Sequence, residues 1–164
     1  MIVRPACDDD AAAIIAIQNP VIRDTLITFN SKERTEDDVR AAIRDLPCFL
    51  VAEDKGNILG FASYIQFRRG VGYARTVEHT IVLSEAARGQ GTGSALLAAV
   101  EAHAADAGMG SIWAGVSGEN PAGVAFHARL GYETVATLPK VGFKFGRWLD
   151  LVLMRKWLKE KDEG

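Results

Sequence analysis

A glycine-rich segment between an expected strand and an expected helix is the feature that most constrains the fold of this chain. A run rich in β-branched residues ends at Leu83, glycines follow at positions 89, 91 and 93, and an apolar stretch of helical periodicity comes next. A strand that passes through such a turn into a helix presents bare backbone N–H groups and the positive end of the helix dipole. The segment therefore predicts an anion-binding site, although a turn that only shapes the chain would also use glycine.

The spacing of these glycines excludes the two common nucleotide-binding loops. No Gly-Lys-Ser/Thr follows the segment, as a Walker A loop requires. The Gly-x-Gly-x-x-Gly pattern of dinucleotide-binding folds is also absent here, and the segment lies in the middle of the chain.

The rest of the chain predicts an α/β protein with a mixed sheet flanked by helices, in a single domain covering residues 1–164. The expected strands are Ile2–Arg4, Phe49–Ala52, Ile58–Phe67, Ala74–Leu83, Ser111–Val116, Tyr132–Leu138 and Trp148–Trp157. The expected helices are Asp8–Asn19, one from Thr35 to Pro47, one that follows the glycine-rich segment and ends at Gly108, and Pro121–Leu130. Residues 20–34 predict an irregular helix plus loop, and Lys159–Gly164 a solvated, fraying end. Antiparallel hairpins beside one β-α-β unit imply both strand orientations in one sheet.

Composition excludes several classes of partner. The formal net charge is −2, which argues against nucleic acid and anionic membranes as partners. The two cysteines are isolated and the three histidines lack the spacing of metal ligands, so we expect neither a disulfide framework nor a bound metal. No run is long and apolar enough to span a bilayer, and acidic residues at positions 8–10 argue against a secretory signal, so we expect a cytoplasmic protein.

The glycine-rich segment also carries a family resemblance. Arg88-Gly89-x-Gly91-x-Gly93 resembles the R/Q-x-x-G-x-G/A signature of the GNAT acetyltransferases, and the segment from Asn120 to His127 and Tyr132 is similar to their N-x6-Y-x2-LGF/Y segment with His in place of Tyr. The order of elements resembles a GNAT acyl-CoA N-acyltransferase fold along the whole chain. The resemblance implies acetyl-CoA as co-substrate, with backbone amides of the loop gripping its pyrophosphate. The residues it implies for acetyl-CoA binding are Ile81, Val82, Leu83, Arg88, Gly89, Gln90, Gly91, Thr92, Gly93 and Asn120.

A narrower resemblance points to the phosphinothricin N-acetyltransferase family, which includes methionine sulfoximine and methionine sulfone acetyltransferases. It is carried by the segments Thr76–Thr80, Val141–Asp150 and Asp24–Phe29. The resemblance implies a small amino acid analogue as substrate, with Phe29 and Thr76 among the substrate-binding residues. Two positions depart from the family pattern, Gln18 and Val82; Gln18 leaves the ranking among substrate analogues open.

The chemistry requires a base, because an α-amino group has a pKa of about 8 and is mostly protonated at pH 7. Glu78 and His79 are the candidates, and regular pleating would point them to opposite faces of the strand. A β-bulge, which GNAT members usually have here, would re-aim either one. We favour Glu78 as base, acting directly or through water; an ion-pairing carboxylate and a hydrogen-bonded core histidine are the structural alternatives.

Two further residues have proposed roles. His127 replaces the tyrosine that serves as acid in many GNAT members, and a histidine can donate a proton near neutral pH; a surface position on the helix is the alternative. Arg75 is the candidate for holding a substrate carboxylate, since guanidinium and carboxylate match as a fork, although a surface arginine would look the same.

The remaining alternatives concern the substrate and the assembly. Another amine, such as an aminoglycoside, a polyamine or a protein N-terminus, would fit the GNAT resemblance, and so would an acyl-CoA-binding module without activity. The segment Phe143–Trp148 is unusually aromatic and basic for a loop, which together with the family's habit predicts a homodimer.

Overall fold

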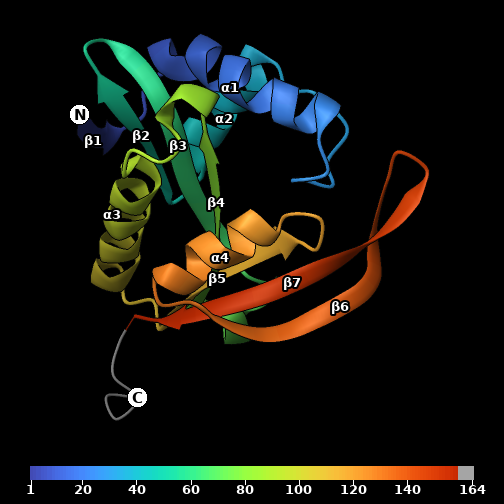
Figure 1. The fold of residues 1–164 in the computed structure, drawn as a ribbon. Coiled ribbons are helices and arrows are strands. Elements are labelled where there is room, and N and C mark those ends of the chain that lie inside the picture. The colour runs from blue at the N-terminus through green and yellow to red at the C-terminus, as the bar shows by residue number, and fades with distance from the viewer. Residues whose placement is uncertain (159–164) are drawn as a thin grey trace.

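A computed structural model describes residues 1–158 as alternating helices and strands (Figure 1). The strands are β1 (Ile2–Pro5), β2 (Cys48–Asp54), β3 (Asn57–Gln66), β4 (Thr76–Leu83), β5 (Ser111–Ser117), β6 (Glu133–Lys144) and β7 (Arg147–Trp157). The helices are α1 (Ala11–Asp24), α2 (Glu36–Asp45), α3 (Thr92–Asp106) and α4 (Pro121–Arg129), with short 3-10 turns at Asp8–Asp10, Val71–Tyr73 and Glu85–Ala87. The predicted order of elements is confirmed, and the predicted fraying end, Lys159–Gly164, lies outside the described residues.

The strands form one mixed sheet in the order β1-β2-β3-β4-β5-β7-β6. Every neighbouring pair is antiparallel except β4 and β5, which the α3 crossover makes parallel. The ladder between β4 and β5 is short, running from Thr76↔Ser111 to His79↔Ala114. The predicted mixed sheet flanked by helices is therefore confirmed. In its one parallel pair, only the first half of β4 is paired with β5.

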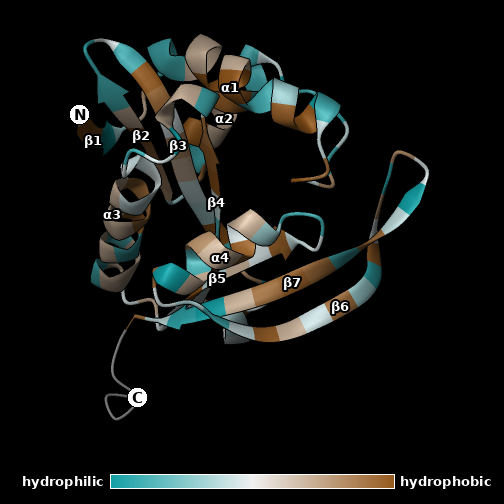
Figure 2. Cartoon of the chain, viewed as in Figure 1, coloured by the Kyte–Doolittle hydropathy of each residue, from teal (hydrophilic) through white to brown (hydrophobic). Residues whose placement is uncertain are grey.

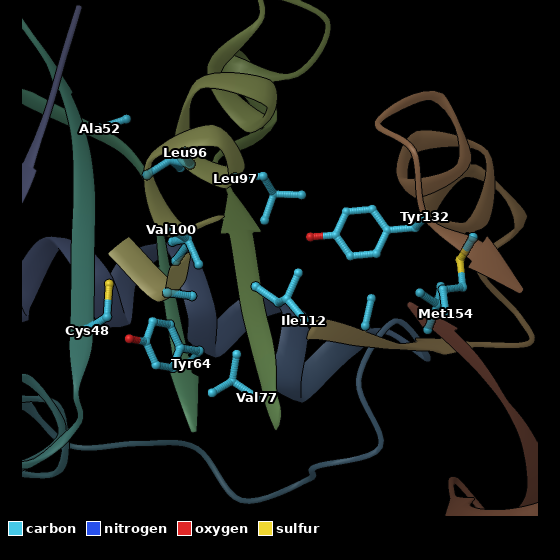
Figure 3. Packing of buried hydrophobic residues seen from close by; sticks show 14 residues of the cluster. Cys48, Ala52, Tyr64, Val77, Leu96, Leu97, Val100, Ile112, Tyr132 and Met154 are labelled. Atoms are coloured by element: carbon cyan, nitrogen blue, oxygen red, sulfur yellow. The ribbon is translucent and has the colours of Figure 1, made fainter. Parts of the chain in front are cut away.

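Helices cover both faces of the sheet and divide the core in two. On one face, α3 places Leu96, Leu97 and Val100 over Ile112 and Tyr64, and Tyr132 and Met154 extend the cluster toward α4 (Figure 3). On the other face, α1 and α2 pack on β2 and β3 through a smaller cluster of buried residues: Ala11, Ile14, Val39, Phe49, Val51 and Phe61. Strand β4 runs between the two clusters and contributes side chains to both.

The first helix differs from the prediction at both ends. Asp8 does not cap it: a 3-10 turn comes first, and the carboxylate of Asp10 accepts a hydrogen bond from the Cys7 backbone N–H and pairs with Arg4. The helix also runs through Pro20 to Asp24 instead of ending at Asn19. Proline costs a helix one hydrogen bond, and here the burial of Ile22 on the same helix offsets that loss.

The aromatic segment Phe143–Trp148, predicted as a loop, is instead the end of a long hairpin formed by β6 and β7. The turn is short, with Phe145 and Gly146 both at positive φ. Strand β6 reaches beyond its predicted end at Leu138 because a register shift between Leu138 and Gly142, with Lys140 at φ 53°, lets the ladder resume. The hairpin projects from the helices, and Figure 2 shows hydrophobic residues along β7.

Within residues 1–158, none of the helices combines the length and the apolar character needed to cross a membrane.

Candidate acetyl-transfer site

The cavity of the site opens where β4 and β5 separate. After His79 and Ala114, β4 stays paired with β3, whereas Gly115, Val116 and Ser117 of β5 pair only with β7. The space between the diverging strands is part of a cavity of about 870 Å³. Its walls come from β4, β5, the glycine-rich segment, α4, and the region of α1 with the loop that follows it.

The glycine-rich segment forms one wall of this cavity. Gly89 and Gly91 have φ of 74° and 82°, and Gly91 is the N-cap of α3. Gly93 lies two residues further along, in the first turn of α3, and a Cβ there would come 2.9 Å from the ring of Phe126 on α4. Arg88, Gly89, Gly91 and Gly93 line the cavity. Bare amides at a helix N-terminus beside a guanidinium are well suited to a pyrophosphate.

Two members of the predicted acetyl-CoA segment face away from the cavity. The Gln90 side chain donates a hydrogen bond to the carbonyl oxygen of Ala86, 2.9 Å away. Thr92 is buried beneath the loop. Because neither side chain lines the cavity, these residues support the loop conformation, and any contact they make with a ligand would come from the backbone.

Strand β4 presents alternate residues to two sides of the sheet. Ile81 and Leu83 pack with the α3 cluster, whereas Val82 packs with the α1–α2 cluster. Pairing of β4 with β3 runs from Val77 to Leu83 without a register shift, so the bulge considered from the sequence is not present in this ladder. Glu78 and His79 therefore point to opposite faces, as their adjacency predicted.

Glu78 is a carboxylate held apart from other charges. It lines the cavity and makes no hydrogen bond or ion pair with another described residue. Gly115 on β5 gives it room, since a Cβ there would lie 2.9 Å from the Glu78 Oε2 atom. Burial raises the pKa of Glu78 above its usual range. A carboxylate whose pKa is shifted toward neutrality is a better match for a general base.

His79 and His127 form a buried pair on the other face. His127 Nδ1 lies 2.8 Å from the carbonyl oxygen of Gly123, and His127 Nε2 lies 3.1 Å from His79 Nε2. A carbonyl oxygen only accepts, so in the neutral form His127 carries its proton on Nδ1 and accepts on Nε2 from His79 Nε2–H. This leaves His79 Nδ1 as a buried acceptor without a partner in the described structure.

The hydrogen bonds of the pair limit what each histidine can do. Burial and the neighbouring His127 lower the pKa of His79 to about 3, and burial lowers the pKa of His127. Both histidines line the cavity, but both nitrogens of His127 are bonded within the protein. The geometry thus favours the hydrogen-bonded core histidine for His79, and His127 would have to leave its partner before it could donate to a bound group.

Asn120 lies at the start of α4, where the cavity meets the helix. Its side-chain oxygen accepts from the Gly123 backbone N–H at 3.1 Å, an N-cap bond of the predicted kind. The same side chain lines the cavity.

The wall opposite the glycine-rich segment comes from the N-terminal part of the chain. Gln18 on α1 and the loop residues Ile27, Thr28 and Phe29 line the cavity there. The Oε1 atom of Gln18 is buried without a hydrogen-bond partner.

The structure separates Arg75 and Thr76 from the other predicted site residues. Neither lines the cavity. They lie at the start of β4, the end opposite Leu83, where the Arg75 carbonyl oxygen accepts from Gly110 N–H at 2.8 Å and the Arg75 side chain is exposed.

Sequence reasoning missed several cavity residues. They are spread over distant elements: Ser94, Phe126, Arg129 and Leu151. Only Phe126 had a usable signal, since it precedes His127 on the same short helix and faces the glycine-rich segment.

Residues 18–132 match the acetyltransferase (GNAT) family, and this range contains the cavity's glycine-rich loop, both histidines and Asn120. The chain belongs to the GNAT family, and it is an acetyltransferase that takes its acetyl group from acetyl-CoA.

Individual relatives are similar over nearly their whole length. The chain is 37% identical to an L-methionine sulfoximine/L-methionine sulfone acetyltransferase of Salmonella typhimurium, over 98% of this chain and 96% of that protein. It is 36% identical to the L-amino acid N-acyltransferase MnaT of Escherichia coli, covering 99% and 97% of the two chains. An acetyltransferase from Salmonella typhimurium, yncA, solved with its cofactor acetyl-CoA, superposes with a TM-score of 0.92 at 34% identity, covering 98% and 95%.

Proposed function

We propose that the protein transfers an acetyl group from acetyl-CoA to the α-amine of a small amino acid analogue of the methionine sulfoximine, methionine sulfone or phosphinothricin type. The observation that carries this proposal is the half-buried Glu78 carboxylate, which lies beside Gly115 in the cavity that the glycine-rich loop also lines. The relatives named for such substrates support the choice. Because the reaction consumes acetyl-CoA, a cytoplasmic metabolite, we also propose a cytoplasmic location.

Glu78 would act on the amine before the acetyl group moves. The carboxylate takes a proton from the ammonium group, directly or through a water molecule, and frees the nitrogen lone pair. The nitrogen attacks the thioester carbon; a C–N bond forms, the C–S bond breaks, and the sulfur leaves with a proton as the CoA thiol. The ammonium group loses two protons in all: Glu78 takes the first and passes it to solvent, and the second leaves the nitrogen as the C–S bond breaks and balances the proton that the sulfur gains.

His127 remains our proposal for the group that protonates the leaving sulfur. It lies on the α4 wall of the cavity. To donate from Nε2 it must exchange its bond with His79 for one with the sulfur, after taking up a proton there. Breaking the hydrogen bond between His127 and His79 therefore adds to the free-energy barrier for protonation of the sulfur.

The amino acid part of the proposal is tested by removing the substrate carboxylate. Methionine sulfone and its decarboxylated amine are compared as substrates of the wild-type protein, which should prefer the amino acid by about 100-fold in kcat/KM, the scale of one charged fork. Arg75→Ala tests the sequence prediction: because the exposed Arg75 side chain does not line the cavity, this variant should keep the preference, as should Arg69→Ala, an exposed arginine in the preceding loop. Equal rates on both amines in the wild type, or a preference for polyamines, would refute amino acid recognition; a preference lost in Arg75→Ala but kept in Arg69→Ala would return the carboxylate to Arg75.

We further propose that two copies associate through the end of the β6–β7 hairpin. Large exposed hydrophobic residues cluster at this end of the hairpin: Val141, Phe143, Phe145 and Trp148. Phe143 and Trp148 are 56% and 61% exposed and contact each other edge to face. Such aromatic clusters are typical of interface cores.

Light scattering tests this assembly. The wild-type protein should have the mass of a dimer, and Trp148→Ala should shift it toward the monomer. Val71→Ala truncates a hydrophobic side chain elsewhere that is even more exposed than Trp148, and it should leave the mass unchanged. A wild-type monomer with full activity would rule out the proposed dimer.

A further inference from the structure

A buried lysine ties the β6–β7 hairpin to the loop that follows α1, which forms one wall of the cavity. Lys144, the last residue of β6, is 3% exposed. Its Nζ donates hydrogen bonds to the carbonyl oxygens of Thr25 and Thr28, at 2.6 and 2.9 Å. Lysine is almost never this buried unless its charge has partners, so these two bonds account for its position.

The two carbonyl groups belong to a segment that needs such partners. Thr25 is the C-cap of α1, and the last carbonyl groups of a helix have no bond within the helix. A cation there also opposes the negative end of the helix dipole. The loop's own bonds are local, from the Thr25 hydroxyl to the Val21 carbonyl oxygen and from Ile27 N–H to that hydroxyl. Lys144 therefore provides a link from this loop to the sheet, 116 residues away along the chain.

A second contact from the same strand face fixes the loop's aromatic residue. Gly142 is buried against Phe29, and a Cβ on Gly142 would lie less than 3.0 Å from carbon atoms of the Phe29 ring. Residues 142 and 144 thus point toward the loop, whereas their neighbours Val141 and Phe143 are exposed. Because Gly142 has no side chain, the Phe29 ring can pack directly against the backbone at position 142.

We propose that Lys144 is a positioning residue for the amine substrate, which it serves by holding the loop of residues 25–29 in the conformation that lines the cavity. Ile27, Thr28 and Phe29 line the cavity, and Lys144 itself does not. Its effect on the reaction therefore passes through the loop, with Gly142 supporting the same conformation. This inference rests on the proposed function, since it assigns the wall formed by the loop to the amine.

The first experiment compares Lys144→Met, which keeps the length of the side chain and removes the donor, with Lys140→Met, an exposed lysine of the same strand. In Lys144→Met the KM for methionine sulfone should rise about tenfold, since small misplacements of a binding wall are costly, while the KM for acetyl-CoA stays within about twofold. Lys140→Met should match the wild type. Equal KM values for the amine in Lys144→Met and wild type, or an equal rise in both KM values, would overturn the proposal.

Hydrogen exchange separates failure of this inference from failure of the proposed function. Backbone amides of residues 25–30 should exchange at least about tenfold faster in Lys144→Met, with the amides of α3 unchanged. This readout needs no substrate. If the wild type acetylates no amino acid analogue but the loop still loosens, the proposed substrate class fails and the positioning role of Lys144 for the loop stands; unchanged exchange refutes that role.

A double-mutant cycle tests the contact at Gly142 without removing the buried charge. Gly142→Ala should raise the KM for the amine about fivefold in the wild type, because Phe29 must move, and should have no effect in the Phe29→Ala background, where the ring is gone. The cycle remains informative if Lys144→Met does not fold. Additive effects of the two substitutions would show that Gly142 acts elsewhere.

Discussion

The two walls of the cavity are built in different ways. The wall beside the glycine-rich loop comes from one stretch, residues 81–94, joined by the short helix α4. The opposite wall comes from the end of α1 and its loop, and it depends on β6, more than a hundred residues later in the chain. The first wall offers backbone amides, which recognise a phosphate group whatever is attached to it. The second offers side chains, and thus can vary with the acceptor while the acetyl donor stays the same.

The largest expected effect concerns the residue between the walls. Glu78→Gln keeps the shape of the side chain and removes the proposed base, so kcat/KM should fall about 100-fold or more, the range of general-base loss. Wild-type activity should also fall on the acid side, through a pKa above the usual carboxyl range, because burial raises the pKa of Glu78 and the protonated form is inactive.

The measurement is a set of acetyl-CoA assays across pH 6–9, with Glu85→Gln, an exposed acid before the loop, as control. Rates in Glu78→Gln that match the wild type at every pH would take this carboxylate out of the mechanism.

The second largest effect is expected from a substitution in the glycine-rich loop, the wall proposed to bind acetyl-CoA. Gly91 has φ 82° with nothing near a Cβ, so Gly91→Val meets no clash and strains only the backbone of the loop. Acetyl-CoA affinity should fall about 30-fold, on the scale of one lost charge-assisted hydrogen bond, and the KM for the amine should change little. Calorimetric titration of acetyl-CoA gives the affinity directly.

Gly56 provides the matched control for that variant. It has φ 81° and equally open surroundings, in the turn between β2 and β3. Gly56→Val should lose comparable stability and bind acetyl-CoA as the wild type does. If both variants bind alike, strain at Gly91 does not reach the ligand and the loop is not the phosphate site.

The smallest expected effect is on stability, through the histidine pair. Burial lowers the pKa of His79 to about 3, while the unfolded chain protonates it below about 6.5. Between those values the unfolded state binds more protons, so stability falls as the pH falls. From pH 7 to 5.5 this histidine alone should lower the free energy of unfolding by about 1 kcal/mol.

Urea unfolding at several pH values tests this, with His79→Phe as the comparison. The variant should lose about 1 kcal/mol of that pH dependence whatever its absolute stability, and His127, whose pKa is also lowered by burial, should supply what remains. An identical slope in both proteins would mean that folding does not lower the pKa of His79.

The features that could be predicted from the sequence are those set by residues close together in the chain. The glycine-rich loop, the Asn120 cap and the opposite orientation of Glu78 and His79 depend on neighbours along the chain, and their positions could be predicted from the residues. Their catalytic roles remain proposals.

What could not be predicted depends on contacts between distant segments. Helix α1 continues through Pro20 because packing offsets the lost hydrogen bond, and the partners of Lys144 lie in a loop with no periodicity. The aromatic segment read as a loop because the register shift after Leu138 interrupts the alternation of β6. Arg75 is close to Glu78 in sequence, yet three residues of extended strand put about 10 Å between them.

The alternation at the end of β6 divides one short segment between two tasks. Even-numbered residues, Gly142 and Lys144, contact the loop of residues 25–29, and odd-numbered residues, Val141 and Phe143, are exposed. Substitutions at odd positions can therefore drift, or be engineered to alter self-association, while the pocket stays as it is. Deleting a single residue here would exchange the two sets of side chains. A phenylalanine ring would then lie where the ammonium group of Lys144 now lies. The segment should therefore tolerate changes of residue type on one side far better than any change of length.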